Sequence, residues 1–368
     1  MVYPKLKVAA TQLNGQNINT ATDTLKALGT VTIKGEVQDA AGNKLSNYNG
    51  IVYPTVYDKM DSLKTLRNDS TGNNQSGNFN YQIQKNILYK GKVSVTNGAF
   101  EFTFIVPKDI KYNTGHGRIS FYVQNGFEDG SGFNTNIKIG GINTSAVADK
   151  LGPEVKLYLN NEKFVFGGLT NNNPVVYALV ADSSGINTVG NGIGHDITVT
   201  VNDDANKIFN VNDYYQSNLN SYSSGKVIYP LELLPPGRHA LKIKVWDIHN
   251  NSSDAYTEFT VAESAGMVID RVLNYPNPFT TNTRFFFEHN LTCQTLLVDI
   301  KIFTLSGKLI KNLSQYVDCQ GYRLDGIAWD GRDDFGDPIG KGVYIYKLKV
   351  TSAEGQSADK IEKLVILR

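Results

Sequence analysis

Apolar and polar residues alternate along most of this chain, and short turn-forming clusters interrupt the alternation repeatedly. In the stretch LLVDIKIF, Val298, Ile300 and Ile302 are apolar, while the intervening Asp299 and Lys301 are charged. A period of two places successive side chains on opposite faces of a strand, whereas a helix needs a period near 3.6. The same alternation recurs in VTIKGEV and LKIKV. The sequence therefore predicts an all-β protein made of tandem immunoglobulin-like β-sandwiches.

The clearest single turn is Asn97–Gly98, which lies between VSV and AFEFTF. Asn-Gly favours positive φ at both positions, which is the geometry of a two-residue hairpin turn. We therefore expect Val95 to pair with Phe100, and Val93 with Phe102, in one hairpin.

Segments rich in Gly, Pro and Asn divide the 368 residues into four parts. A chain of this length has room for two to four domains. Residues 1–28 alternate weakly and are expected to be a lead-in or linker. Sandwich domains are predicted over 29–146, 152–262 and 268–368.

Composition excludes several classes of function. The chain has 36 basic and 35 acidic residues, a net charge of +1, and no clustered basic face of the kind that binds nucleic acid. It has no run of eighteen apolar residues, and its first residues lack the apolar core of a signal peptide. The absence of an export signal in a surface-type composition suggests that an N-terminal part is missing.

Candidate nucleophiles and bases do not form a recognisable motif. The chain has five histidines, of which His289 is near Cys293 in a loop-like stretch, and we do not expect this pair to be catalytic. Cys293 and Cys319 lie in the same predicted domain, so they either form a disulfide or remain thiols.

The acidic stretch DGRDDFGD is a candidate calcium loop. Calcium loops place oxygen ligands at alternating positions, but here Arg332 and Phe335 interrupt the alternation. We therefore expect a solvated turn in which Asp side chains bind local amides, and Ca²⁺ remains the alternative. No other cofactor is expected.

The last hundred residues resemble the C-terminal signal domain of proteins exported by the type IX secretion system. The resemblance rests on NYPNPF, VDIKIFTLSGKLI, WDGRDDFGDPIGKGVYIYKL and KIEKLVILR, in that order. It implies an immunoglobulin-like sandwich that the export machinery recognises. The motif residues that we carry over are Asn274, Pro276, Asn277, Pro278, Phe279, Gly307, Trp329, Asp330, Gly331, Gly336, Gly342, Tyr344 and Lys363.

The rest of the chain resembles the region that follows the protease domain in type IX secretion sortases, which are gingipain-like cysteine peptidases. The resemblance rests on TLKALGTVTIKGEVQDAAGNKL, IQKNILYKGKVSV, GINTVGNGIGHD and PPGRHALKIKVWDIHNNSS. It implies that residues 1–28 follow a catalytic domain that is absent from this chain, so we carry over no catalytic residue.

The family resemblance also implies a role and partners. The full-length sortase is expected to cleave C-terminal signal domains from cargo and to attach the cargo to anionic lipopolysaccharide. This chain is expected to be its docking and export arm at the outer membrane and cell surface. The implied partners are the barrel protein PorV, the attachment-complex proteins PorQ and PorZ, and type IX cargo, but no nucleic acid.

Two alternatives remain open. The chain is the tail of a type IX-secreted adhesin or hydrolase, or it is a carbohydrate-binding module. A carbohydrate-binding module requires an aromatic platform on one sandwich face or in a concave loop.

Overall fold

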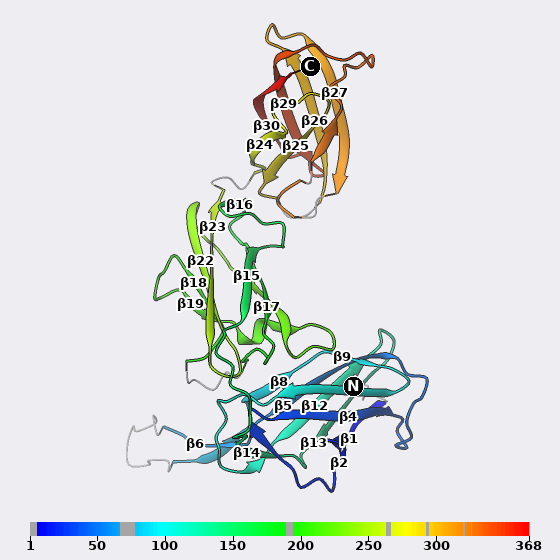
Figure 1. The fold of residues 1–368 in the computed structure, drawn as a ribbon, viewed down its shortest axis with the longest axis vertical. Coiled ribbons are helices and arrows are strands. Elements are labelled where there is room, and N and C mark those ends of the chain that lie inside the picture. Colours follow the sequence, from blue (N-terminus) through cyan, green and yellow to red (C-terminus); the bar gives the residue numbers. More distant parts are fainter. Residues whose placement is uncertain are drawn as a thin grey trace, which may run out of the picture.

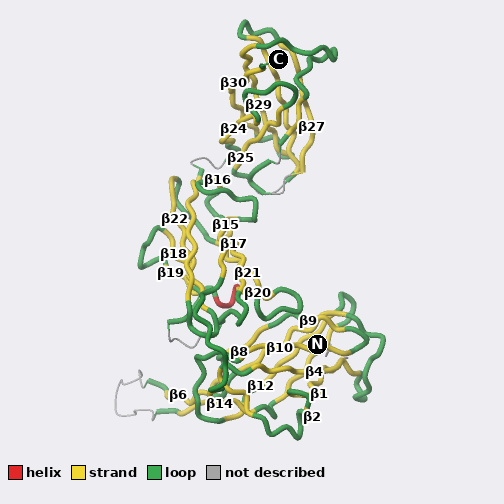
Figure 2. The backbone as a smooth tube through the Cα atoms, viewed as in Figure 1, coloured by secondary structure: helices red, strands yellow, loops and turns green. Residues whose placement is uncertain are grey.

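The computed structural model describes residues 6–66, 78–188, 194–262, 266–291, 294–318, 321–324 and 326–367. Three β bodies lie end to end, and the C-terminus lies at the far end of the third body (Figure 1). Within the described ranges the only helix is a single 3₁₀ turn, η1 (Asn212–Tyr214), and no helix could span a bilayer (Figure 2). The prediction of an all-β chain of tandem immunoglobulin-like sandwiches is confirmed.

The first sandwich, β1 to β14, is built around a nine-stranded sheet with the main path β10-β4-β1-β13-β12-β5-β8, to which β2 and β9 add. A small sheet, β11-β14-β3, and the β6–β7 hairpin complete it. Its strands are β1 (Leu6–Leu13), β2 (Gln16–Asn17), β3 (Thr24–Ala27), β4 (Thr30–Gln38), β5 (Gly50–Tyr57), β6 (Asp61–Lys64), β7 (Asn80–Ile83), β8 (Ile87–Lys90), β9 (Val93–Val95), β10 (Ala99–Ile105), β11 (Gly115–His116), β12 (Arg118–Gln124), β13 (Asp129–Asn134) and β14 (Lys138–Ile142).

The expectation that residues 1–28 form a lead-in is wrong for its described part. Strand β1 lies inside the nine-stranded sheet, antiparallel to β4 and parallel to β13. Leu6, Val8 and Leu13 are buried in the core. The pattern was weak because small residues occupy the middle of β1 and the register with β4 shifts between Ala10 and Gln12.

The Asn97–Gly98 turn has the predicted geometry. Asn97 and Gly98 have φ of +51° and +71°, and Thr96 and Ala99 exchange two backbone hydrogen bonds across them. A Cβ at position 98 would lie 2.2 Å from the carbonyl oxygen of Leu45, so glycine is needed there for space as well as for φ.

The strand pairing predicted on either side of this turn is wrong. Strand β9 pairs with β5, and β10 pairs with β4 along its whole length, so the two strands separate directly after the turn. Val93, Val95, Phe100 and Phe102 nevertheless all face the core, as the alternation predicted. Periodicity fixes the face of a strand, but it does not choose the neighbour.

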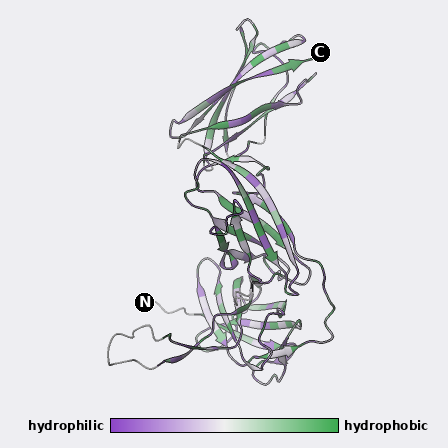
Figure 3. Ribbon diagram, turned by 90° about the vertical axis from the view of Figure 1, so that its left-hand side faces the viewer, coloured by the Kyte–Doolittle hydropathy of each residue, from purple (hydrophilic) through white to green (hydrophobic). Residues whose placement is uncertain are grey.

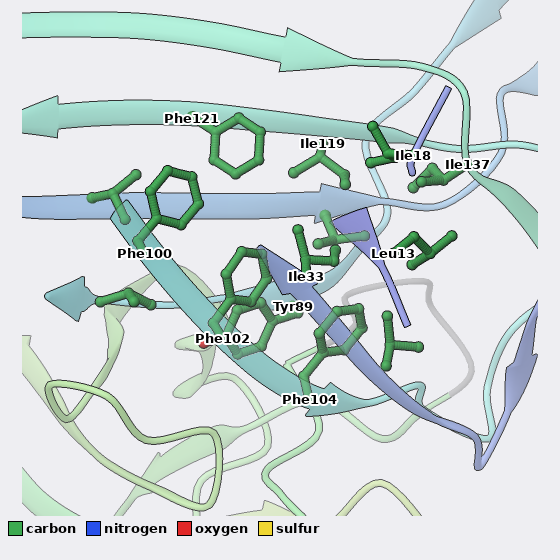
Figure 4. Packing of buried hydrophobic residues seen from close by; sticks show 14 of the residues in the cluster. Leu13, Ile18, Ile33, Tyr89, Phe100, Phe102, Phe104, Ile119, Phe121 and Ile137 are labelled. Carbon is green, nitrogen blue, oxygen red and sulfur yellow. The ribbon is translucent and has the colours of Figure 1, made fainter. Parts of the chain in front are cut away.

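Aromatic residues fill much of this first core (Figure 4). The Tyr89 ring stacks on Phe102 and Phe104, with centroids 5.5 and 4.8 Å away. Phe100 packs against Phe121 with centroids 5.6 Å apart. These residues come from β8, β10 and β12, so their contacts hold the two ends of the curled sheet together.

The second sandwich packs a four-stranded sheet, β15-β17-β21-β20, on a five-stranded sheet, β16-β23-β22-β18-β19. Leu241, Ile243 and Val245 of β22 are all fully buried, as their alternation predicted. Its strands are β15 (Glu154–Leu159), β16 (Gly168–Thr170), β17 (Val175–Ala181), β18 (Thr198–Val201), β19 (Ile208–Asn210), β20 (Tyr215–Ser217), β21 (Ser224–Pro230), β22 (Gly237–Trp246) and β23 (Ser252–Val261).

The third sandwich packs a three-stranded sheet, β24-β25-β28, on a four-stranded sheet, β27-β26-β29-β30. Val298, Ile300 and Ile302 point into its core, as predicted, and hydropathy alternates along the strands of all three bodies (Figure 3). Its strands are β24 (Ile269–Tyr275), β25 (Thr283–His289), β26 (Thr295–Thr304), β27 (Leu309–Asp318), β28 (Ile327–Trp329), β29 (Gly342–Ser352) and β30 (Ser357–Ile366).

Candidate functional site: the signal-type motif and the two sandwich junctions

The NYPNPF motif leaves β24 and binds the end of the last strand, β30. Asn277 Nδ2 donates to the carbonyl of Lys363 at 3.1 Å, and Asn277 Oδ1 accepts from the backbone N–H of Val365 at 2.9 Å. The backbone N–H of Phe279 donates to the carbonyl of Val365, and that of Leu367 donates to the carbonyl of Phe279. The motif therefore fastens the beginning of the third sandwich to its final strand.

Phe279 anchors this fastening in the core. Its side chain is 3% exposed, and its ring meets Trp329 edge-on with centroids 5.7 Å apart. Trp329 stacks on Phe285 and donates its indole N–H to the carbonyl of Arg332 at 2.9 Å. The NYPNPF and WDG motifs, which are fifty residues apart in the chain, thus meet at one point of the core.

Asn274 and Thr283 shape the turn that carries the motif. Asn274 Nδ2 donates to Thr283 Oγ1 at 3.1 Å, and Thr283 Oγ1 donates to the carbonyl of Pro276 at 2.8 Å. The Tyr275–Pro276 and Asn277–Pro278 peptide bonds are both cis.

The DGRDDFGD stretch forms a turn closed by its own side chains. Asp330 accepts a hydrogen bond from the backbone N–H of Arg332, and Asp333 accepts from those of Phe335 and Asp337. These are the local amide bonds expected of a solvated turn. The backbone φ is +69° at Gly331 and +91° at Gly336, which suits glycine.

The remaining motif residues lie in other parts of the third sandwich. Gly307, at φ +85°, lies in the β26–β27 turn. Gly342 pairs with Ile366 at the start of β29, and the Tyr344 hydroxyl donates to the carbonyl of Gly340 at 2.8 Å. Asn277, Phe279, Trp329 and Lys363 of the motif thus lie close together, whereas Gly307 lies in a separate turn.

Glu288 and Arg271 join the third sandwich to the second. The Glu288 side chain is 5% exposed, and its Oε2 accepts the backbone N–H of Leu169 at 3.2 Å. Arg271 lies 3.4 Å from Glu288 Oε1 and donates to the carbonyl of Gly167 at 2.6 Å. Sequence reasoning missed this junction, although a charged residue inside the apolar run FFFEH was a usable signal.

Replacing Glu288 with Ala is expected to loosen this junction. The backbone N–H of Leu169 would lose its acceptor, which costs about 1–3 kcal/mol for a buried group. Glu288→Gln keeps an acceptor oxygen and is the matched control. Small-angle scattering should show a wider range of particle dimensions for the Ala variant, and identical scattering from all three proteins would contradict the assignment.

Asp109 joins the first sandwich to the second. Its side chain is 8% exposed and accepts hydrogen bonds from three second-sandwich residues. The partners are His195 Nδ1 at 2.6 Å, Asn250 Nδ2 at 2.8 Å and Asn187 Nδ2 at 3.2 Å. The His195 ring also packs on Trp246, with centroids 4.4 Å apart.

Replacing Asp109 with Ala is expected to free the second-sandwich loops from the first sandwich. Each buried donor that loses its acceptor costs about 1–3 kcal/mol. Backbone amides near Asn187 and Asn250 should then exchange hydrogen faster in mass spectrometry. Asp109→Asn retains one acceptor oxygen, so its exchange rates should lie between those of the parent protein and those of Asp109→Ala. Unchanged exchange in both variants would argue against a junction held by Asp109.

Three carboxylates lie together near this junction. One oxygen from each of Asp149, Asp182 and Asp247 lies within 4.8 Å of the others. Burial raises the pKa of Asp247, whose Oδ1 accepts hydrogen bonds from the backbone N–H groups of His249 and Asn251 and whose Oδ2 accepts one from Asn251 Nδ2. Carboxylate oxygens are ligands that Ca²⁺ prefers, but here loop amides occupy those of Asp247.

Of the other residues that the sequence singled out, the histidines lie in structural surroundings, and both cysteines lie outside the described residues. His239 Nε2 lies 2.7 Å from the carbonyl of Pro235, and its Nδ1 lies 3.0 Å from Asn202 Nδ2. Burial lowers the pKa of His289 to about 4. Cys293 and Cys319, and with them the disulfide question, lie outside the described residues, as do residues 189–193 of the GINTVGNGIGHD stretch.

The sequence matches no protein-family model and no curated protein sequence. Among solved structures, dimeric latent PorU from Porphyromonas gingivalis is 31% identical with a TM-score of 0.43, and the match covers 99% of this chain and 34% of that one. Fibronectin(III)-like modules of CbhA from Clostridium thermocellum are 8% identical, with a TM-score of 0.23 over 58% of this chain and 93% of that chain. The FN1–FN3 domains of chicken CNTN1 are 9% identical, with a TM-score of 0.23 and full coverage of both chains.

The match to PorU rests on sequence identity along nearly all of this chain. The chain spans about a third of the length of the PorU chain that it matches. The motifs of the third sandwich had indicated the same family. This chain therefore resembles the C-terminal region of PorU over almost its whole length.

Proposed function

We propose that this chain is the docking and export arm of a PorU-like type IX secretion sortase, and that it has no catalytic site of its own. The observation that carries the proposal is the 31% identity with PorU over 99% of the chain. The third sandwich supports it, because its signal-type motif residues bind one another and the last strand.

In this proposal the full-length protein cleaves C-terminal signal domains from cargo and attaches the cargo to anionic lipopolysaccharide. The arm works at the outer membrane and cell surface, where it docks the protease to PorV and meets PorQ and PorZ. Tandem sandwiches suit such a role, since they present loops and strand edges to partners along an extended body.

Binding of the purified chain to PorV in detergent tests the proposal. Saturable binding is expected in biolayer interferometry, and Phe279→Ala should weaken it, because this variant disturbs the third sandwich. Phe127→Ala, at a 96% exposed position of the first sandwich, is the matched control. Failure to bind PorV, together with binding to neutral polysaccharide, would favour the carbohydrate-binding module instead.

The third sandwich is further proposed to remain attached in the mature protein as a tether. Glu288 and Arg271 support this, because they hold it to the second sandwich. Intact mass measurement of the surface protein is expected to include β30. A mature chain that ends before Ile269 would contradict the tether and would fit the tail of an ordinary secreted adhesin or hydrolase.

A further inference from the structure

A cleft lies where the first and second sandwiches meet, between the edges of two sheets. Strands β8 and β9 lie along one edge of the first sheet, and β20 is the outermost strand of the sheet β15-β17-β21-β20 (Figure 2). Lys90 to Lys92 form one wall of the cleft, and Tyr215 to Leu219 form the other. Its volume is about 520 Å³, which is within the range of ligand sites.

The backbone of the first wall alternates between β5 and the cleft. The N–H of Gly91 donates to the carbonyl of Pro54 on β5 at 3.0 Å, in line with the antiparallel register of β5 with β8 and β9. Bonded and non-bonded positions alternate in an antiparallel pair, so Lys90 and Lys92, on either side of Gly91, direct their backbone groups away from β5. The carbonyl of Lys92 accepts the N–H of Asn220 from the second sandwich at 2.8 Å. The N–H and carbonyl of Lys90 have no such partner among the described residues.

The second wall has the same alternation. The N–H of Asn218 donates to the carbonyl of Ser224 at 2.9 Å, directly after the antiparallel pairing of β20 with β21. Asn218 and Gln216 are therefore the positions that bond toward β21, and Ser217 between them directs its N–H and carbonyl outward. Ser217 lines the cleft, so these groups form part of the open edge of the second wall.

The two open edges run side by side. Lys92 and Leu219 form a parallel β-bridge between the sandwiches. Lys90 and Ser217 each lie two residues before this bridge, so they occupy corresponding positions on the two edges. The bridge closes one end of the cleft, and beyond it each edge keeps backbone groups without a partner in the described part of the chain. Such groups pair readily with an added strand.

Lysine side chains give the cleft a positive charge. Lys90 and Lys92 are two residues apart on one edge, so their side chains point to the same face, about 7 Å apart. Lys226 of β21 also lines the cleft, and its ammonium lies 6.0 Å from the Tyr177 ring centroid. None of the ion pairs among described residues involves these three lysines, and Asp213 is the only carboxylate among the described lining residues. A ligand that carries carboxylates is therefore favoured.

From these features we infer that the cleft binds an acidic segment of a partner protein in extended form. The backbone of the segment pairs with the open edge at Lys90 or Ser217. Asp or Glu at alternate positions of the segment lie over Lys90 and Lys92, because side chains on one face of any strand repeat with the same spacing. The open backbone groups favour a peptide over other anions, which have no main chain to add to a sheet edge. This inference goes beyond the proposed role as a sortase arm and does not rest on it.

Isothermal titration calorimetry of the purified chain tests the inference with three pentapeptides. In the first, Glu alternates with Val and Thr. The second has Gln in place of each Glu, and the third is the acidic peptide N-methylated at every peptide bond, which keeps the charges and removes the backbone donors. The acidic peptide is expected to bind and to weaken as salt screens the lysines. The other two should bind at least about tenfold more weakly, since each lacks one of the two kinds of contact.

Two outcomes of this titration would overturn the inference. Equal affinity for the Gln peptide would mean that the lysines do not select acidic side chains. Equal affinity for the N-methylated peptide would mean that charge alone attracts the ligand and that no strand is added.

Paired lysine variants locate the charged contacts. Replacing Lys90 and Lys92 together with Ser is expected to lower affinity for the acidic peptide by about tenfold or more. Replacing Lys308 and Lys341, which are exposed on the third sandwich, removes the same charge elsewhere and should leave affinity unchanged. Equal losses in the two double variants would mean non-specific attraction and would sink the idea.

Ser217 variants test the backbone contact. Ser217→Pro removes an N–H that points outward, a position at which edge strands tolerate proline, and should weaken binding. Ser217→Ala keeps the N–H and is the matched control. Melting temperatures check that both variants fold. If the proline variant melts early, the N-methylated peptide still tests the same kind of bond on the unaltered protein.

Hydrogen exchange shows where the peptide lies. Peptides that contain Lys90 or Ser217 should exchange more slowly when the acidic pentapeptide is bound, because a paired edge amide is protected. Binding that leaves exchange at both edges unchanged would place the ligand elsewhere and contradict the inference.

Discussion

Phe279→Ala is expected to destabilise the third sandwich by about 3–5 kcal/mol, the range found for buried Phe→Ala substitutions. The Phe279 side chain is 3% exposed and packs on Trp329. The backbone hydrogen bonds between Phe279 and β30 do not involve its side chain. In Phe279→Ala these bonds therefore remain, next to the cavity that the lost ring leaves. For a domain whose total stability is about 5–15 kcal/mol, this loss is a large fraction.

Trp329 reports this loss directly. In a Trp246→Phe background, Trp329 is the only remaining tryptophan and lies beside the new cavity. Urea unfolding followed by its fluorescence should show a lower midpoint for Phe279→Ala. Phe335→Ala, at a position that is 93% exposed in the same sandwich, should change stability by no more than about 0.5 kcal/mol. Equal midpoints for the two variants would show that the motif phenylalanine does not anchor the domain.

Local features of the fold could be predicted from sequence, because strand periodicity reports which face of a strand is buried. Val298, Ile300 and Ile302 point inward as predicted, and Asn97–Gly98 turns with positive φ. The neighbours of a strand depend instead on the whole sheet. Strand β10 pairs with β4 rather than with β9, which precedes it across the turn.

Strand β1 and the contacts between sandwiches could not be predicted from the sequence, for different reasons. Strand β1 has a register shift and small central residues, so its alternation is weak although it lies inside the sheet. Asp109 and Asn250 are 141 residues apart, and neither lies in a pattern that predicts the other. Polar contacts between domains combine single residues from distant loops, which periodicity cannot report.

The motif of the third sandwich shows what a resemblance adds. The resemblance identified Asn277, Phe279, Trp329 and Lys363 as members of one motif. In the structure these four residues meet through named hydrogen bonds and ring contacts. These contacts explain how the motif stabilises the fold of the third sandwich, and recognition of this domain for export is part of the proposed function.

His289 should make the third sandwich sensitive to acid. The side chain is 1% exposed, and burial lowers its pKa from 6.5 to about 4. Below pH 6.5 the unfolded chain takes up a proton that the folded chain refuses, so stability falls as pH falls and rises as pH rises. The loss is about 1.4 kcal/mol per pH unit between pH 6.5 and about 4, or about 3 kcal/mol in all.

His289→Gln removes the titrating group and isolates this effect. Carboxylates such as Asp270, whose pKa is lowered although burial opposes the shift, also contribute to acid sensitivity, but they do so equally in both proteins. Urea midpoints read from Trp329 between pH 4 and pH 7 should therefore fall more steeply for the parent protein than for the variant. Above pH 7 the two curves should run parallel, since the imidazole is then neutral in both folded and unfolded parent chains. Parallel curves over the whole range would show that the His289 ring reaches solvent when it is protonated, and that its burial does not control the acid stability of this sandwich.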